Sequence, residues 1–306
     1  MHSTDQAAQR LGTIAAEVFA YELEEARRAG AIGYLARVLV QATMPHSNPG
    51  DVAAWGRQNG SLSLVIQPGI RLVAGQPRSI GLPYGAIPRL LLAWVTTEAV
   101  RTRQRQLLLG DTLSGFMRQH DLTPTGGRWG TIPRLREQMR RLFASTIACS
   151  YDGAHGVAGA KLDVASEYSL WWDPKQPDQA ALWHSSVTLG ERFYDEVISR
   201  PVPIDMRTLK ALKRSPLALD VYAWLTYRFS YLQKPVTVPW EALQLQFGCD
   251  YKLTRQFRAK FTGALAKVHT HYPEARVDIA PSGLLLQPSP THIRRHPSRL
   301  VPGGDN

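Results

Sequence analysis

The chain repeats one order of elements at an offset of 130 residues. Two helical stretches each start at a proline and carry a tryptophan, Trp94 in the first and Trp224 in the second. Proline is favoured at the first position of a helix, so both starts are clearly marked. A later apolar helix keeps the same offset, because Leu113 in the first copy corresponds to Leu243 in the second. We therefore expect two similar folding units in one chain.

A strongly basic helix follows in each copy. Residues 131–145 place apolar side chains on one stripe at helical spacing, and three arginines point away from that stripe. Residues 251–272 have a similar stripe, together with five positive charges and no acid. A helix face that only contacts water usually mixes charge signs, so an uncompensated positive face indicates a phosphate-rich partner.

Extended segments follow the basic helix in each copy. In the second copy, residues 277–279 and 284–286 flank a Pro-Ser-Gly turn and predict a hairpin. In the first copy, residues 146–151 and 161–172 are joined by a glycine-rich stretch, 152–159. Helix, short strand, helix, basic helix and hairpin is the order of a winged helix-turn-helix, whose third helix enters the major groove of DNA. We predict an α+β fold with two tandem winged-helix domains and an N-terminal helical extension.

The predicted domain limits follow these changes in pattern. They are a helical extension over 1–45, a first winged-helix domain over 46–172, a connector over 173–206, a second winged-helix domain over 207–290 and a flexible tail over 291–306. Apolar spacing predicts one or two helices in residues 7–42, broken near Gly30 and Gly33. Residues 62–66 and 70–73 are predicted to pair as a hairpin and to pack on the first unit.

The charge of the chain is unevenly distributed. Lysine and arginine number 36 against 25 acids among 306 residues, for a net charge of +11. Residues 1–150, 151–196 and 197–306 carry 17, 3 and 16 basic and 10, 8 and 7 acidic side chains, so their nets are +7, −5 and +9. Two basic lobes therefore flank an acidic connector, which favours a polyanionic partner such as nucleic acid. Arginine outnumbers lysine 28 to 8, which suits paired contacts to phosphate or guanine, although the base composition of the host gives the same bias.

The sequence predicts no cofactor, no metal and no membrane span. Cys149 and Cys249 are one hundred positions apart and lack partners at metal-ligand spacing. The longest apolar runs are far shorter than the roughly 20 residues that cross a bilayer, and no signal peptide is found at the N-terminus. We expect a protein of the bacterial cytoplasm.

The two basic helices supply the side chains that DNA binding requires. The predicted DNA-binding residues are Arg128, Arg134, Arg136, Arg140, Arg141, Lys252, Arg255, Gln256, Arg258 and Lys260. Gln256 can pair twice with adenine, whereas Arg136 and Arg258 lie on the flank of the apolar stripe, where bracing the unit is the alternative. Trp129 is expected in the core. Two units that read successive major grooves would cover roughly 20 base pairs and suit direct repeats.

An enzymatic role is the weaker alternative. A strand-nicking initiator needs a pair of histidines for a metal and a tyrosine nucleophile, and His269-Thr-His271 with Tyr272 has these residue types, but at the end of a helix. No Gly-Lys-Ser/Thr phosphate loop occurs in the sequence. Scattered acids at Glu167, Asp173 and Asp178 are more typical of a solvated loop than of a metal site. We expect no catalytic residues.

Four blocks of sequence, residues 81–102, 126–131, 134–143 and 215–228, resemble the RepA family of plasmid replication initiators. The similarity runs from about residue 40 to about residue 290. It implies a plasmid-encoded protein that binds repeated double-stranded DNA at the plasmid origin, promotes opening of the duplex, recruits the host initiator, helicase loader or helicase, and represses its own promoter.

The resemblance also implies a homodimer, with an interface on the first unit near the predicted hairpin at 62–73. Initiators that bind repeated origin sites carry two winged-helix domains, in agreement with the repeat described above. A transcriptional repressor with the same two DNA-reading units and no role in replication is the alternative of a different class, and only the family resemblance favours the initiator.

Overall fold

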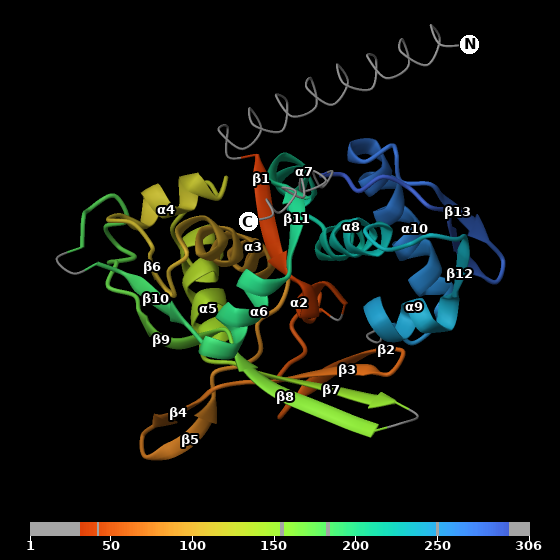
Figure 1. The fold of residues 1–306 in the computed structure, drawn as a ribbon. Coiled ribbons are helices and arrows are strands. Elements are labelled where there is room, and N and C mark those ends of the chain that lie inside the picture. Colours follow the sequence, from red (N-terminus) through yellow and green to blue (C-terminus); the bar gives the residue numbers. More distant parts are fainter. Residues whose placement is uncertain (1–30, 42, 154–155, 182–183, 249–250, 294–306) are drawn as a thin grey trace, which may run out of the picture.

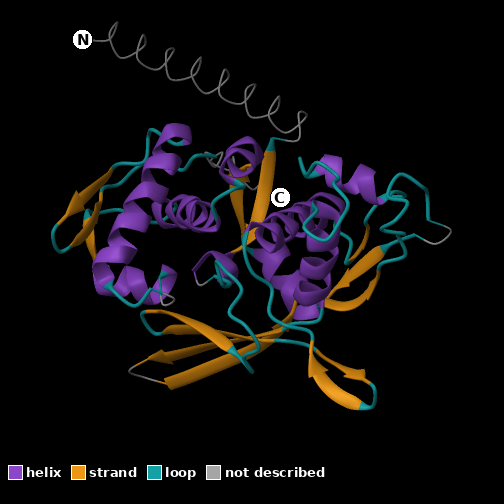
Figure 2. Ribbon diagram, turned by 180° about the vertical axis from the view of Figure 1, so that it is seen from behind, coloured by secondary structure: helices purple, strands orange, loops and turns teal. Residues whose placement is uncertain are grey.

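A computed structural model of the chain describes residues 31–41, 43–153, 156–181, 184–248 and 251–293. Two groups of helices stand side by side, with strands β1 (Ile32–Ala36) and β11 (Pro201–Asp205) between them (Figure 1). A four-stranded sheet runs along one side of both groups, as the view from behind also shows (Figure 2). The arrangement is a mixed α/β fold with small sheets.

The first unit follows the predicted order of elements. In chain order its elements are α3 (Ala86–Thr102), β6 (Gln106–Leu108), α4 (Leu113–Gln119), α5 (Thr131–Phe143), β9 (Ala165–Ser169) and β10 (Ser186–Leu189). The strands form a three-stranded sheet in the order β6-β10-β9. Thr112 begins α4 as the sequence predicts, because its hydroxyl accepts a hydrogen bond from the amide of Gly115 at 3.0 Å.

The second unit repeats this order. Its elements are α7 (Met206–Leu212), α8 (Pro216–Phe229), β12 (Val236–Pro239), α9 (Trp240–Phe247), α10 (Thr254–His271), β13 (Val277–Ala280) and β14 (Gly283–Leu286). Its sheet has the order β12-β14-β13, so in both units the last strand lies in the middle of the sheet. Helices α3 and α8 begin 130 residues apart, and so do strands β6 and β12. The predicted internal repeat is confirmed for these elements.

The predicted pairing of residues 146–151 with 161–172 holds in part, because Thr146–Ala148 of β7 (Thr146–Gly153) pair with Lys161–Asp163 of β8 (Gly156–Asp163). Most of the glycine-rich stretch 152–159 is strand and not loop, and the hairpin that matches β13–β14 is β9–β10. β7 also pairs with β3 (Leu62–Gln67), and β3 pairs with β2 (Trp55–Asn59). These four strands form the additional sheet β2-β3-β7-β8.

The hairpin predicted between residues 62–66 and 70–73 is wrong. β3 is paired along both edges, by β2 and by β7, so it has no free edge for the next strand. β4 (Ile70–Val73) pairs with β5 (Gln76–Ser79) instead, in a separate two-stranded ribbon whose residues are all exposed. The chain changes direction at Gly69, between β3 and β4. Only glycine fits there, because a β-carbon would lie 2.5 Å from the carbonyl oxygen of Ala144.

The helical prediction for residues 7–42 holds over residues 37–41 and is wrong over residues 32–36. Residues 1–30 lie outside the described part of the chain, residues 32–36 form β1, and only α2 (Arg37–Gln41) is helical. β1 pairs antiparallel with β11, whose partner residues lie about 170 positions later. Gly33 allows a close approach, because a β-carbon there would lie 2.2 Å from the sulfur of Met206.

Among the described residues, each unit has a large hydrophobic core, and α3 contributes to both; Val40, Val202 and Ala223 form a smaller cluster. Phe116, Leu135 and Met139 lie in the first core, whereas Leu90 and Ala93 of α3 pack into the second. The segment predicted as a connector contains α6 (Glu191–Ser199), which packs on the first core, and then β11. The units are therefore joined by packed elements and not only by covalent linkage.

Candidate nucleic-acid interface

Helix α5 buries its predicted apolar stripe and exposes one arginine fully. Ile132, Leu135 and Met139 are buried, Arg134 is exposed, and Arg136 is half-buried. In the part of the chain that the structure describes, no ion pair forms to Arg134. Its guanidinium is therefore available to a phosphate or a base edge.

Arg140 and Arg141 are held by Glu137. Arg140 lies 2.5 Å from one carboxylate oxygen of Glu137 and Arg141 lies 2.8 Å from the other. Arg141 also donates to the carbonyl of Leu82 and lies over the ring of Tyr84, with 17% of its side chain exposed. These contacts brace α5 against the start of α3. Arg140 and Arg141 follow Glu137 by three and four residues, the spacing of neighbouring side chains on a helix. Both ion pairs could therefore have been predicted from the sequence.

Trp129 is exposed and not in the core, so that expectation is wrong. It lies just before α5 with 80% of its surface exposed, and the guanidinium of Arg128 is 5.1 Å from its ring centroid. The turn is fixed by Thr125 and Thr131, whose amides each donate to the other's hydroxyl at 3.0 and 2.9 Å. The tight turn directs the indole outward, where an aromatic ring beside an arginine can stack on a base or sugar.

Helix α10 presents a larger cationic surface. Phe257, Phe261 and Leu265 are buried as predicted. The exposed polar residues are Lys252, Arg255, Gln256, Lys260 and Lys267. Arg258 is half-buried, and its guanidinium lies 4.9 Å from the ring centroid of Trp240, an arrangement that braces α10 against α9. Of the predicted residues in this unit, four are therefore open to a ligand and one is engaged within the fold.

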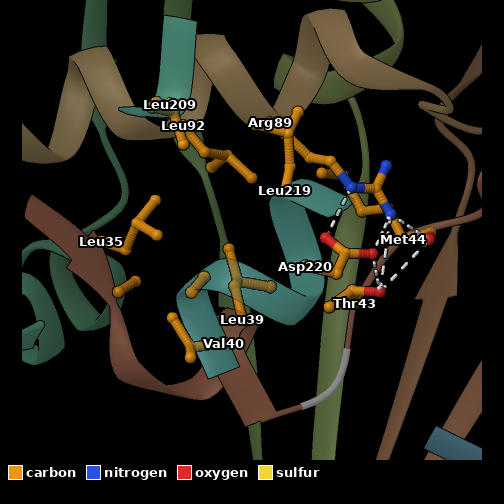
Figure 3. Close-up of a pocket in the computed structure, with 12 residues that line it drawn as sticks. Leu35, Leu39, Val40, Thr43, Met44, Arg89, Leu92, Leu209, Leu219 and Asp220 are labelled. Atoms are coloured by element: carbon orange, nitrogen blue, oxygen red, sulfur yellow. Dashed lines mark hydrogen bonds and ion pairs between the residues drawn. The ribbon is translucent and has the colours of Figure 1, made fainter. Parts of the chain in front are cut away.

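A buried ion pair joins the two units. Arg89 of α3 donates two hydrogen bonds of 2.7 Å to the carboxylate of Asp220 on α8, and both side chains are nearly inaccessible (Figure 3). Thr43 and His46 contact the same carboxylate at 2.8 and 2.7 Å. Burial alone raises the pKa of Asp220, but Arg89 and His46 outweigh burial and hold that pKa well below its usual range. Neither residue is among the predicted site residues, although a charge inside each apolar helix is a visible signal in the sequence.

An apolar cavity of about 40 Å³ lies beside this ion pair. Leu35, Leu39, Val40, Leu92 and Leu209 line it, with Asp220 and Arg89 at one end (Figure 3). Its volume suits about one to three water molecules, and its walls are mostly apolar. The cavity is too small for an organic cofactor.

Tyr272 and Asp178, two of the residues that suggested an enzyme or a metal site, are engaged in the fold. Tyr272 is buried, its hydroxyl donates to the carbonyl of Pro290 at 2.5 Å, and burial raises its pKa. Asp178 accepts from Ser114 at 2.6 Å and from Arg118 at 2.9 Å. Within the described ranges, no group of three His, Cys, Asp or Glu side chains could hold a metal ion. Among the same residues, no helix has both the length and the apolar character that crossing a membrane requires.

The fold resembles that of two solved domains. A crystal structure of domains 2 and 3 of RctB aligns with a TM-score of 0.51 and 9% identity, and covers 79% of this chain and 94% of that chain. A second crystal structure of RctB domains 2-3 aligns with a TM-score of 0.45 and 9% identity, over 81% of this chain and 94% of the other. No curated protein sequence matches the chain significantly. The first alignment defines the class, a protein with the two-domain fold of RctB domains 2 and 3.

The family is defined by sequence. The family model described as plasmid encoded RepA protein matches residues 82–241, more than half of the chain. The chain belongs to this family, which confirms the resemblance found in the sequence. Membership supports a replication initiator of a plasmid, and DNA binding at an origin is the general property that such a role implies. The match includes all of α5 and α8 but ends before α10.

Proposed function

We propose that this protein initiates plasmid replication by binding repeated double-stranded DNA at the plasmid origin through two winged-helix domains. Helices α5 and α10 are the recognition helices and enter successive major grooves on one side of the duplex. The observation that carries the proposal is the repeated unit. In each of the two copies, a helix, a strand and a second helix come before a cationic helix, and two strands of the same sheet order come after it. A monomer with two such units suits direct repeats.

The proposed contacts divide into two kinds. Arg134 and Arg255 reach base edges or phosphates from exposed positions on the two helices, and Gln256 reads adenine. Lys252 and Lys260 neutralise phosphates. Arg136, Arg140, Arg141 and Arg258 contribute positive potential while they brace their units, and Arg128 with Trp129 extends the first contact surface.

Further steps of initiation are assigned to surfaces outside these helices. We infer that the protein promotes origin opening, recruits the host initiator, helicase loader or helicase, and represses its own promoter, without a cofactor and without catalytic residues. The acidic face of α6, with Glu191 and Asp195 exposed, is the proposed contact for a host protein. It carries the opposite charge to the DNA-binding helices, so one surface does not compete with the other.

The ribbon β4–β5 is the proposed dimer interface. Ile70 is 72% exposed and Leu72 is 73% exposed on an unpaired strand edge, and Val73 is 43% exposed. A two-stranded ribbon with exposed apolar residues is marginally stable alone and gains by pairing with a second copy. A dimer of this kind would support repression of the promoter.

A gel-shift titration across a salt series tests the function. The DNA that flanks the gene is compared with shuffled DNA of equal length, and Arg134→Ala and Arg255→Ala are compared with Arg192→Ala, an exposed arginine on acidic α6. We expect stepwise binding of the flanking DNA only, weakened about tenfold by each of the first two substitutions, or about 1.4 kcal/mol, and unchanged by the control. Equal binding of both DNAs, with no effect of either substitution, would refute the proposal.

A transformation assay separates the initiator from the repressor. A plasmid whose only origin is the flanking DNA should be established by the wild-type protein and lost with the Arg134→Ala, Arg255→Ala double variant. Repression of a promoter reporter without plasmid establishment would instead favour the transcriptional repressor. A supercoiled plasmid incubated with the protein should remain unnicked, since Tyr272 is buried.

A further inference from the structure

A basic groove adjoins the recognition surface of α10 and shares Lys260 with it. It runs between the segment around His46, the start of α8 and the middle of α10, and has a volume of about 650 Å³. Arg214, Lys260 and Lys267 line it, and all three are exposed. None of the described residues that line the groove is acidic. Three cations around one hollow repel one another, so an anion between them is favourable.

The start of α8 adds to this positive field. Ser215 caps the helix, and Pro216 at the first helical position has no amide hydrogen, so Leu217 provides the first amide of the helix. The helix is 14 residues long, and its aligned peptide dipoles place a partial positive charge at this end. Phosphate groups are bound at such ends in many proteins.

His46 supplies an independent observation. It lines the groove with 12% of its side chain exposed, and its Nε2 lies 2.7 Å from Oδ2 of Asp220. Its Nδ1 is buried and has no hydrogen-bond partner among the described residues. With the Nε2 hydrogen directed at a carboxylate, Nδ1 is a bare lone pair in the neutral ring and a donor in the protonated ring. An anion in the groove would accept a hydrogen bond from Nδ1 of the protonated ring.

We propose that this groove binds a phosphate group, held by Arg214, Lys260 and Lys267 with His46 as an inner donor. The phosphate is a diester of the DNA backbone or free phosphate. Where it comes from DNA, the proposal rests on the proposed function and extends the contact of α10 to Arg214 at the start of α8. Lys267 and Arg214 then act as phosphate-binding residues of the second unit.

The groove has a direct link to the junction between the units. His46 and Arg89 contact the same carboxylate, so a phosphate that draws a proton onto His46 changes the charge next to the ion pair that joins α3 to α8. Burial lowers the pKa of His46, and Asp220 opposes this effect, while Arg89 and Arg57 reinforce it. Arg214, Lys260 and Lys267 line the same groove as the ring.

The first arm of the test measures the salt dependence of DNA binding. The double variant Arg214→Ala, Lys267→Ala is compared with Lys175→Ala, Arg192→Ala, which removes the same two residue types from exposed positions near the acidic segment. If the phosphate belongs to DNA, the slope of log K against log salt falls by about 1 to 2 in the first variant and is unchanged in the second. Affinity for flanking and shuffled DNA should fall by the same factor.

The second arm uses inorganic phosphate alone. In a histidine-labelled NMR titration of the full chain, the ring signals of His46, assigned with His46→Gln, should move on addition of phosphate and not on addition of chloride at equal ionic strength. The movement should be lost in Arg214→Ala, Lys267→Ala. A response in this arm without a change of slope assigns the groove to free phosphate.

An unchanged slope together with an unmoved His46 signal would overturn the phosphate groove. That result leaves the proposed function intact if Arg255→Ala still weakens binding to the flanking DNA. Failure of the wild-type protein to bind that DNA would overturn the proposed function instead, and the NMR arm would then decide the groove by itself.

Discussion

Replacing Arg89 by methionine should break the junction between the two units. One guanidinium donates five hydrogen bonds of 3.2 Å or less, two to Asp220 and one each to the carbonyls of Pro45, Gly85 and Met44. Removing one partner of a buried ion pair costs about 3–5 kcal/mol, because the other charge stays buried without compensation. Methionine keeps most of the volume, so cavity formation adds little. We expect the free energy of unfolding to fall by about 4 kcal/mol.

Urea unfolding followed by tryptophan fluorescence measures this loss. With a slope of about 2–3 kcal/mol per molar urea, the midpoint should fall by about 1.5–2 M. Arg101→Met is the matched control on the same helix, since Arg101 pairs with Glu98 at the surface and 68% of its side chain is exposed. An exposed pair contributes about 1 kcal/mol at most, so the control should unfold close to the wild type.

A double variant separates the buried charge from the other losses. Asp220→Leu with Arg89→Met removes both charges and should be more stable than Arg89→Met alone, because no uncompensated carboxylate remains. The carbonyls of Met44 and Gly85 still lose their donor, so recovery is partial. A midpoint for Arg89→Met equal to that of the control, or additive losses in the double variant, would refute the role of the ion pair.

Three further predictions concern other parts of the molecule. His120 is buried against Trp94 and Phe116, and burial, with a contribution from Lys210, lowers its pKa to about 4. The pKa of His120 in the folded state lies below its value in the unfolded state, so the unfolded state takes up the proton first as pH drops. The free energy of unfolding should therefore fall by about 3 kcal/mol between about pH 6.5 and about pH 4. Urea unfolding at a series of pH values measures this fall, and His120→Gln should flatten the curve in that range. Leu72→Ser should abolish a concentration-dependent dimer in analytical ultracentrifugation and leave DNA affinity unchanged, whereas a monomer at every concentration of wild type would contradict the proposed interface. Trp129→Ala should change the thermal midpoint by less than about 2 °C, because the ring is exposed, yet weaken DNA binding several-fold in a gel shift; unchanged affinity would show that the ring makes no contact with DNA.

The repeated helices were predictable from sequence because their signals are local. A cap or a proline at the start and apolar residues at helical spacing lie within one segment, as in α8 with Ser215 and Pro216. The pairing of β1 with β11 was not predictable in this way, since its two strands are about 170 residues apart and each is short. The same holds for β3, whose alternating buried residues Leu64 and Ile66 predict a strand but do not identify its neighbours.

The candidate site shows the same division between local and distant causes. Arg255, Lys260 and Lys267 of α10 are exposed because the helix has no acid to pair with them, whereas Arg258 packs on Trp240. Arg140 and Arg141 differ, since Glu137 lies within one helical turn of both and reduces the outward charge of α5. The exposure of Trp129 depends on how a threonine pair fixes the preceding turn, which residue type and hydropathy do not reveal.

These differences give the two units different relations to DNA. Helix α5 is already braced by protein carboxylates and carbonyls, so its contact surface consists of Arg134 and the turn with Trp129, which suits a small number of directed contacts. Helix α10 and the start of α8 carry exposed cations that no described acid neutralises, so phosphates are the groups that relieve their repulsion. The ion pair between Arg89 and Asp220 joins the two units. His46 contacts the same carboxylate and so links the ion pair to the cationic surface of the second unit. If both units bind DNA as proposed, we therefore expect the second unit to supply most of the salt dependence of binding and the first unit to be the more discriminating partner.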